Sequence, residues 1–405
     1  MTFDPGERKS GAPEGCSLRE RIADEIAHHG PIPFSRYMEL CLYEPELGYY
    51  SRAREQFGKA GDFYTSSDVH AVFGRLLARQ FEEMWQALDS PARIDLIELG
   101  PGRGLFARDV LDWSDKQFPE FSRALRYALV EQSAHLRTKL QERLREHAAG
   151  GRCEIFDSLE SSVSRASDHL IVFANEFFDA LPVEVIDHRG AVRVGFENGR
   201  FIETFVAASA AEDEFLDRYG VHPEDGERVE APLASLTWMD RIAAAFQNRC
   251  GFLVVIDYGY TREEQLAGRY RDTIMSYRQH TVSASPYEAP GEQDITAHVN
   301  FTALRARGVE RGLAPLALVT QSQFLIGIGE ETQFADAFQG SPARAAFALA
   351  GVEDCRLPQE HTKVALQLKH LIAPTGMGET FQVLVMSRDV GEKRATGLSG
   401  IRLAH

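Results

Sequence analysis

Carboxylates follow five apolar stretches that are typical of buried strands, and they are the first residues that could do chemistry. They are Glu98, Glu131, Asp157, Glu176 and Asp257. Ligands of parallel sheets bind at the carboxyl ends of the strands, so we expect these side chains to meet at one edge of a sheet. Carboxylates there can hold an amine or a guanidinium by charge-assisted hydrogen bonds. Any one of them could instead cap the helix after its strand, but five such caps explain the pattern poorly.

The stretch from Asn175 to Pro182, Asn-Glu-Phe-Phe-Asp-Ala-Leu-Pro, holds the two strongest candidates for a catalytic role. Glu176 is the first candidate and Asp179 the second, because each could orient a basic acceptor group. Phe177 and Phe178 could face a cationic ligand, although such residues more often belong to the core. The sequence therefore predicts a site for a basic nucleophile after this strand.

A glycine-rich turn follows the apolar run Ile94–Leu99. Gly100, Gly102 and Gly104 are spaced two apart, and a helical pattern begins at Leu105. A buried strand, a tight turn and a helix form the unit that binds nucleotide-like ligands. The glycines let backbone N–H groups approach the ligand, and the helix N-terminus adds a positive dipole.

The spacing of this turn argues against a dinucleotide site. The pattern G-x-G-x-x-G/A needs a small residue at position 105, where this chain has Leu105. A ligand without a pyrophosphate has less need of that residue. The turn resembles motif I of the class I S-adenosylmethionine (SAM) methyltransferases. A nicotinamide or flavin fold and a purely structural turn remain the alternatives at this point.

Composition and charge are those of a soluble globular protein. The 405 residues are 44% hydrophobic and 26% charged, and the net charge is −16. This balance argues against a nucleic-acid surface and suits a cationic substrate. The polar residues 1–17 are expected to be a disordered lead-in without a secretory signal, and no apolar run is long enough to cross a membrane. We expect a cytoplasmic protein with no membrane insertion.

Cysteine and histidine spacing gives no metal site. The five cysteines include no C-x-x-C pair, which fits a reducing compartment and mostly buried thiols. No metal-ligand spacing is present. His298 is the histidine with the strongest functional claim, as a general base, but a structural role is equally open.

Strands and helices alternate along the chain. Helices are expected at 18–29, 33–42 and 69–88, and strands at 94–99, 125–130, 153–156, 170–174, 252–256, 316–320 and 381–386. Residues 184–205 alternate around Asn198-Gly199, which predicts a hairpin. The fold class is therefore α/β, with a doubly wound, mainly parallel sheet. We expect a helical cap at 18–90, a core at 91–388 with an insertion around 188–250, and a tail at 389–405.

A set of motifs in a fixed order extends the resemblance to nearly the whole chain. They are Gly48-Tyr-Tyr50, Gly61-Asp-Phe-Tyr-Thr-Ser66, Phe73-Gly74, Glu98-Leu-Gly-Pro-Gly-Arg-Gly104, Asn175 to Pro182, Asp257-Tyr-Gly259, Asp294-Ile-Thr-Ala-His-Val-Asn-Phe301, Gln321-x-x-Phe-Leu325 and Met377-Gly-x-x-Phe381. Together they resemble the MidA family of class I SAM-dependent methyltransferases over residues 18–388.

The resemblance implies a Rossmann-like methyltransferase core that uses SAM and releases S-adenosylhomocysteine. It implies catalytic or acceptor-site roles for Glu176, Asp179, His298 and Asp257. It also implies cofactor contacts from Gly61, Asp62, Phe63, Thr65, Ser66, Glu98, Gly100, Pro101, Gly102, Gly104, Glu131, Asp157, Ser158 and Asn175. Glu131, 31 residues after Gly100, would hold the ribose hydroxyls.

The resemblance also suggests the acceptor. The MidA family includes the mitochondrial complex I assembly-factor arginine methyltransferase, which makes symmetric dimethylarginine on a complex I subunit. Protein-arginine N-methylation of a respiratory-complex subunit is therefore the expected activity. Two departures from the family pattern are Asn175, where many members have His, and Ser67-Asp-Val69, where Pro-Glu-Ile is commoner. A SAM-binding assembly factor with little catalysis and a small-molecule methyltransferase are the alternatives.

Overall fold

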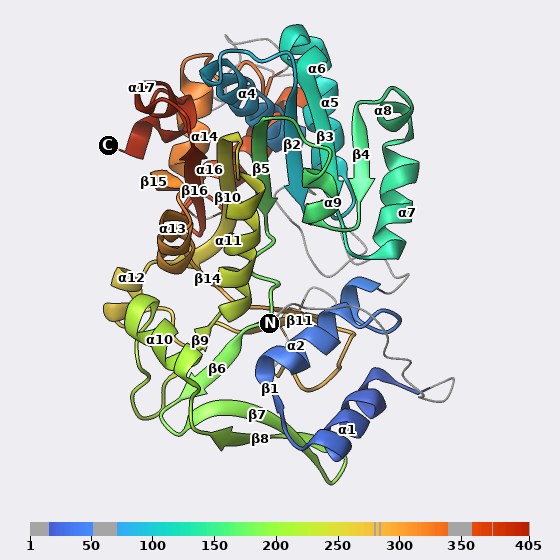
Figure 1. Cartoon of the computed structure of the whole chain (residues 1–405), viewed down its shortest axis with the longest axis vertical. Coiled ribbons are helices and arrows are strands. Elements are labelled where there is room, and N and C mark those ends of the chain that lie inside the picture. Colours follow the sequence, from blue (N-terminus) through green and yellow to red (C-terminus); the bar gives the residue numbers. More distant parts are fainter. Residues whose placement is uncertain are drawn as a thin grey trace.

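The structure has two lobes, with the larger one above the smaller one in Figure 1. It is a computed structural model that describes residues 16–51, 71–278, 281–282, 285–338, 359–374 and 376–404. The larger lobe is built on an eight-stranded sheet, and the smaller lobe on two short sheets and the N-terminal helices.

The large sheet confirms the expected doubly wound architecture. Its main path runs β15-β16-β10-β5-β2-β3-β4, and β14 pairs with β10. The strands are β2 (Ile94–Leu99), β3 (Leu125–Val130), β4 (Cys153–Phe156), β5 (His169–Asn175), β10 (Cys250–Tyr260), β14 (Val299–Asn300), β15 (Ala314–Thr320) and β16 (Phe381–Arg388). β16 is antiparallel to both neighbours, and the other main-path pairs are parallel. The order reverses between β2 and β5, which is where such sheets bind ligands.

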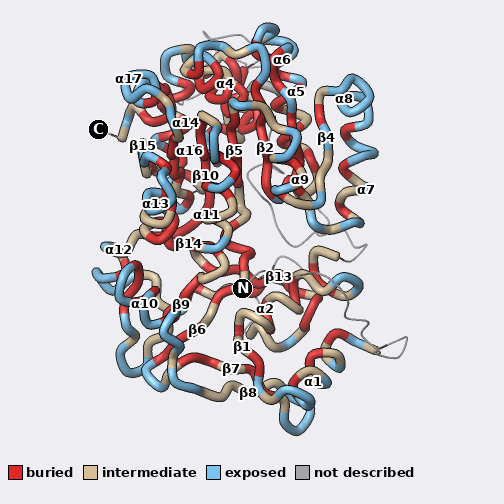
Figure 2. The backbone as a smooth tube through the Cα atoms, in the orientation of Figure 1, coloured by how far each residue is buried: buried red, intermediate tan, exposed pale blue. Residues whose placement is uncertain are grey.

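Helices cover both faces of this sheet. One face carries α4 (Ala71–Ala87), α5 (Leu105–Gln117), α6 (Pro119–Ala124), α14 (Gln321–Glu330) and α16 (Gln359–Ile372). The other face carries α9 (Leu159–Val163), α11 (Leu233–Ala245) and α13 (Phe301–Glu310). Side chains of one strand alternate between the two cores, so that Leu96 packs into the first and Ile97 into the second. Buried residues therefore follow the strands in Figure 2, and exposed residues lie on the outer helices.

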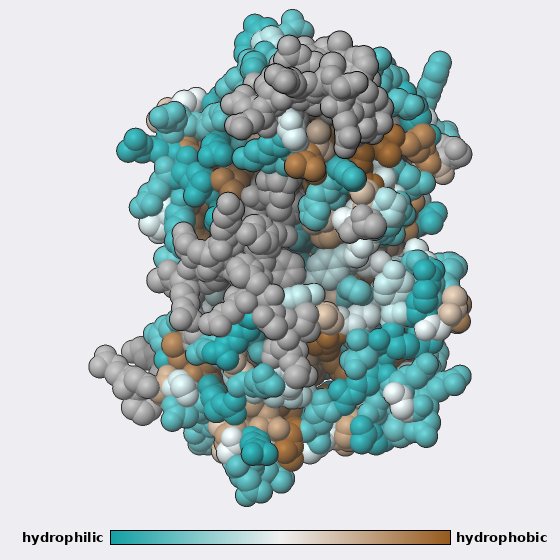
Figure 3. Space-filling model, turned by 180° about the vertical axis from the view of Figure 1, so that it is seen from behind, coloured by the Kyte–Doolittle hydropathy of each residue, from teal (hydrophilic) through white to brown (hydrophobic). Residues whose placement is uncertain are grey.

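Shorter helices complete the chain. They are α7 (Ala134–Arg143), α8 (Arg145–Ala149), α10 (Ala210–Tyr219), α12 (Arg262–Leu266), α17 (Glu392–Ala395) and the 3-10 turns η1 (Tyr49–Ser51) and η2 (Ser399–Ala404). None of the helices in the described ranges is long and apolar enough to cross a membrane. Seen from behind, hydrophilic side chains cover most of the described surface, and hydrophobic ones occupy smaller areas (Figure 3).

Helix α4 packs in the large lobe, although its sequence position suggested the N-terminal cap. It lies against α5. Gly74 allows the close approach, because a Cβ atom there would lie 2.8 Å from Cβ of Asp109. The helices that do belong to the small lobe are α1 (Leu18–His29) and α2 (Phe34–Tyr43).

The small lobe is formed by the N-terminal helices, by part of the segment 188–250 and by strands that precede and follow this segment in the sequence. Its strands are β1 (Ile32–Pro33), β6 (Glu184–Asp187), β7 (Gly190–Glu197), β8 (Arg200–Val206), β9 (Arg228–Ala231), β11 (Met275–Arg278), β12 (Thr281–Val282) and β13 (Asp294–Thr296). The expected hairpin is present as β7 and β8. Asn198 and Gly199 have φ of +50° and +76°, as the two central residues of a type I′ turn require.

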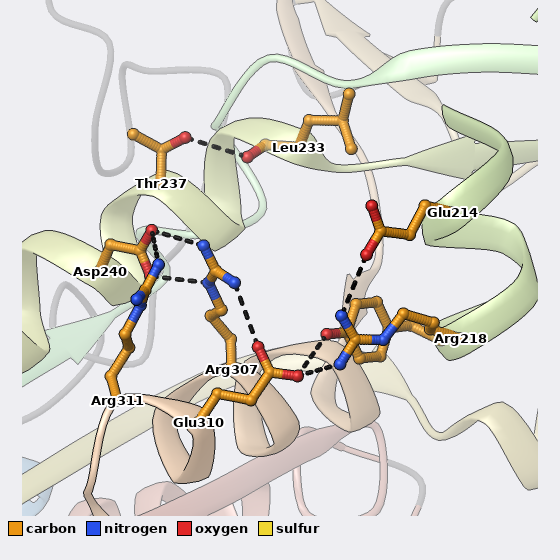
Figure 4. Close-up of polar contacts among 9 residues, drawn as sticks. Glu214, Arg218, Leu233, Thr237, Asp240, Arg307, Glu310 and Arg311 are labelled. Carbon is orange, nitrogen blue, oxygen red and sulfur yellow. Dashed lines mark hydrogen bonds and ion pairs between the residues drawn. The ribbon is translucent and has the colours of Figure 1, made fainter. Parts of the chain in front are cut away.

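An ion-pair network ties α10 of the small lobe to α11 and α13 of the large lobe (Figure 4). Asp240 accepts two hydrogen bonds of 2.6 Å from Arg307 and bonds of 2.8 and 3.2 Å from Arg311. Glu310 pairs with Arg307 at 3.1 Å and also with Arg218 on α10. Ion-pair networks of this kind contribute more to stability than isolated surface pairs do, so they hold the two lobes in one arrangement at this edge.

Candidate active site

A large cavity lies between the two lobes, at the carboxyl ends of β2 to β5. Its volume is about 1550 Å³, above the usual range of roughly 300–1,000 Å³ for a site that holds one small ligand. The sheet contributes the glycine turn and the residues after β3, β4 and β5, whereas α2, η1, β13 and α11 line the remaining walls. The cavity therefore has room for a cofactor and for part of a second substrate.

The glycine turn lines the cavity through Gly100, Pro101, Gly102 and Arg103, whereas Gly104 does not line it. Gly100, Gly102 and Gly104 have positive φ angles of +63°, +50° and +71°, which residues other than glycine rarely adopt. A Cβ atom on Gly104 would lie 2.6 Å from Cδ2 of Leu140. Gly104 thus serves the packing of α5 against α7, and the structure gives it no place in the cofactor-facing wall where the sequence put it.

Glu98 is a buried acid in the cavity wall. It is 5% exposed, and its Oε2 atom accepts a hydrogen bond of 2.8 Å from the hydroxyl of Tyr127. Burial raises the pKa of Glu98 to about 8, and the Tyr127 bond offsets only part of this effect. Glu98 makes no ion pair within the described part of the chain, so a cationic ligand group would stabilise its charge.

The acids after β3 and β4 line the same cavity. Glu131 accepts a bond of 2.8 Å from the backbone N–H of Ser133, and burial raises the pKa of Glu131 to about 7. Asp157 is exposed at the rim, where the hydroxyls of Ser161 and Ser158 lower its pKa. Ser158 caps α9. The structure brings these predicted cofactor residues to one edge, as the sequence suggested.

The turn after β5 has a strained backbone. Glu176 has φ of +50°, which is uncommon outside glycine, and its N–H donates to the carbonyl of Ile256. Asp257 Oδ2 accepts three further bonds, of 3.2, 3.0 and 3.3 Å, from the N–H groups of residues 177 to 179. Asn175 and Glu176 line the cavity. Such strain concentrates at functional sites when the surroundings impose it.

Asp257 holds this turn from behind and does not line the cavity. The sequence placed it after a strand ending at Ile256, but β10 continues to Tyr260 because β16 and β14 supply hydrogen-bond partners. Asp257 is fully buried, and burial and the charges of Asp179 and Glu176 raise its pKa. Its contacts make it a positioning residue instead of one that touches a substrate.

Asp179 is the buried acid with spare hydrogen-bonding capacity. It lines the cavity and is 5% exposed. Its Oδ2 atom accepts a bond of 2.6 Å from the Tyr258 hydroxyl, whereas Oδ1 has no partner among the described residues. Burial raises the pKa of Asp179 to about 6. Oδ1 of Asn175 is also buried without a partner in that part of the chain. Buried oxygens of this kind need a donor, and a bound substrate can supply it.

His298 lies outside the cavity. Its ring packs edge-on against Tyr258, with centroids 5.1 Å apart, and against Tyr270. Burial lowers the pKa of His298 to about 4, so the ring is neutral at pH 7. The structure supports the structural role and does not place His298 at the acceptor as a general base.

Two residues of α11 in the cavity wall, Trp238 and Arg241, were not predicted from the sequence. Trp238 on α11 packs edge-on against Phe177, with centroids 4.9 Å apart. Arg241 stacks over Trp238 at 3.9 Å and makes two bonds of 2.8 Å with Glu160. Nothing in the local sequence of α11 distinguishes these residues from an ordinary amphipathic helix.

Tyr43 and Tyr50 also line the cavity, and they come from the N-terminal part. The Tyr43 hydroxyl donates to the carbonyl of Ala180 at 2.8 Å, and the Tyr50 hydroxyl to Asp294 Oδ1 at 2.9 Å. The conspicuous aromatic turn around Gly48 was the available signal. The predicted cofactor residues Gly61, Asp62, Phe63, Thr65 and Ser66 lie outside the described residues.

Comparisons with known proteins agree with this architecture. The model of a family of S-adenosyl-L-methionine-dependent methyltransferases matches residues 76–319. A crystal structure of a protein from Burkholderia thailandensis bound to S-adenosyl-homocysteine is 30% identical, with a TM-score of 0.77, and covers 95% of this chain and 94% of its own.

Two curated relatives are named as arginine methyltransferases. The mitochondrial protein arginine methyltransferase NDUFAF7 homolog of Drosophila melanogaster is 29% identical over 91% of this chain and 84% of its own length. The human protein arginine methyltransferase NDUFAF7 is 28% identical over 81% and 76%. Both are named mitochondrial, and this finding overturns the cytoplasmic location expected from the sequence.

Proposed function

This chain belongs to the family of S-adenosyl-L-methionine-dependent methyltransferases whose model matches residues 76–319, and we propose that its methyl acceptor is a nitrogen of a protein arginine. The observation that carries the proposal is Asp179, a buried carboxylate with an unpartnered oxygen in the wall of the cavity. A guanidinium has five N–H donors and can satisfy it. The names of the curated relatives point to the same acceptor.

The residues at the sheet edge fit SAM. Gly100 and Gly102 leave the backbone open to a close ligand, Glu98 suits the ammonium group, and Glu131 suits the ribose hydroxyls. Asp157 and Ser158 would border the adenosine end. When bound, SAM supplies a methyl group on a positively charged sulfur.

The protein's own part in the transfer is to orient and to accept a proton. We infer that Asp179 and Glu176 hold the guanidinium so that one nitrogen faces the methyl carbon. As the nitrogen–carbon bond forms, the carbon–sulfur bond breaks and its electron pair stays on sulfur. The nitrogen then loses a proton, for which the Asp179 carboxylate is the available acceptor, while Asp257 keeps the turn in place.

The target protein is proposed from the family resemblance. We expect the arginine to lie on a respiratory-complex subunit, with symmetric dimethylarginine as the product and a role in complex I assembly. A cavity of about 1550 Å³ with acidic walls suits a protein side chain better than a small molecule.

A transfer assay tests the proposal. Purified protein is incubated with SAM and with a respiratory-complex subunit or its arginine peptides, and the products are read by mass spectrometry. We expect methylarginine, and loss of at least about 100-fold in rate for Asp179→Asn and Glu176→Gln, with SAM affinity retained.

The matched control is Asp225→Asn, a fully exposed aspartate of the small lobe, which should behave as wild type. SAM binding without methylation of any arginine would refute the proposal and favour an assembly factor. Methylation of a small molecule alone would favour the other alternative.

A further inference from the structure

Two tyrosines close one end of the cavity, and we call Tyr43 and Tyr50 the tyrosine collar. Their rings contact each other, with centroids 5.6 Å apart and planes tilted by 30°. One hydroxyl is fixed on the carbonyl of Ala180 and the other on the carboxylate of Asp294. The collar thus joins the turn that follows Asp179 to strand β13 of the small lobe.

A second connection completes a ring of contacts. The N–H of Ala297, just after β13, donates to the backbone carbonyl of Asp179 at 3.0 Å. Asp294 and Asp179 are therefore brought to the same end of the cavity by two independent routes, and both line it. They are 6% and 5% exposed, so neither charge is well solvated.

The collar also touches the cofactor end. The hydroxyl of Ser133 donates to the backbone carbonyl of Tyr50 at 3.1 Å, and the N–H of Ser133 donates to Glu131. The ring of contacts therefore lies beside the edge where the cofactor residues gather.

We propose that Asp294 is a second acceptor-binding carboxylate, which together with Asp179 receives a guanidinium, and that Tyr50 positions it. The inference rests on the proposed arginine acceptor. Two buried carboxylates at one end of a cavity favour a cationic ligand group that can reach both of them. A planar guanidinium donates hydrogen bonds in several directions at once, whereas a lysine ammonium is a compact point charge. The pair therefore selects arginine over lysine.

Equilibrium binding tests this without catalysis. N-acetyl-arginine methylamide and its lysine counterpart are titrated by NMR into the full chain saturated with S-adenosylhomocysteine. Wild type should prefer the arginine compound by at least about tenfold. Asp294→Asn should weaken binding of the arginine compound about tenfold or more and remove most of the preference for it over the lysine compound. Tyr50→Phe should weaken binding of the arginine compound about threefold. S-adenosylhomocysteine affinity should stay within twofold in both variants.

Two variants control for general damage. Asp225→Asn and Glu142→Gln each neutralise an exposed carboxylate that does not line the cavity, and both should leave the two titrations unchanged. Equal binding of the two compounds by wild type, or an unchanged preference in Asp294→Asn, would overturn the inference. Absence of arginine methylation in the transfer assay, with these binding results intact, would refute the proposed function alone.

Discussion

Replacing Glu98 by Gln should make the cofactor-free protein more stable and should weaken the binding of SAM. Glu98 is buried and accepts a hydrogen bond from the Tyr127 hydroxyl, and glutamine can accept the same bond. In the folded protein, ionisation of this acid is opposed by burial. An amide of the same shape carries no such charge.

The size of the effect follows from the pKa. Glu98 titrates near 8 in the folded protein and near 4.5 in an unfolded chain, so the folded state binds the extra proton between these values. Stability of the wild type therefore falls as pH rises through this window, by about 3 kcal/mol at pH 7 and up to about 5 kcal/mol above pH 8. Glu98→Gln should escape that loss.

Thermal unfolding of the cofactor-free protein at pH 5, 7 and 9 measures the difference. The melting temperature of Glu98→Gln should exceed that of the wild type by an amount that grows with pH, while the Kd for SAM rises at least about tenfold at pH 7. Glu142→Gln, an exposed residue on α7, is the control and should match the wild type. A difference in melting temperature that does not change with pH would refute the reasoning about burial.

Three further substitutions probe other parts of the molecule. Asp257→Ala removes the acceptor for three backbone N–H groups, so it should lower the free energy of unfolding by about 2–4 kcal/mol and reduce kcat more than SAM affinity. Chemical denaturation and steady-state kinetics measure these effects, and an unchanged kcat would contradict the positioning role. Asp240→Asn should cost about 1–2 kcal/mol at pH 7. Despite partial burial, hydrogen bonds from Arg311 and Arg307 lower the pKa of Asp240 in the folded protein, so this difference should begin to shrink below about pH 4 and disappear at still lower pH; denaturation at pH 7 and over the range below about pH 4 tests the sign. Gly104→Ala should destabilise by about 1–3 kcal/mol through its positive φ and the contact with Leu140, and a variant as stable as wild type would exclude the packing role.

The large sheet was predictable because its signals are local. β2 and β3 begin and end where the sequence predicted, since strands buried on both faces are mainly apolar and stop at polar or glycine residues. β10 ran past its predicted end because hydrogen bonds from neighbouring strands, which no local pattern reveals, carry it through Asp257.

The residues that the large sheet contributes to the candidate site were predictable for the same reason, whereas those from the small lobe were not. Glu98, Glu131 and Glu176 each lie at the carboxyl end of a strand, so their positions could be inferred from strand ends alone. Tyr50 and Asp294 meet across 244 residues of sequence, and only the packing of the small lobe brings them together. His298 has a suggestive neighbourhood in the sequence, but its ring turns to Tyr258 and away from the cavity.

The division of the cavity walls between two lobes has an evolutionary consequence. Under the proposed function, methyl donation would depend on strand ends of the large sheet, while the collar and Asp294 belong to α2, η1 and β13. Sequence change in the small lobe would then alter which arginine-bearing protein is bound without disturbing the SAM site. Relatives that share the glycine turn can diverge in their target proteins, and we expect the residues that differ with the target to lie in the small lobe.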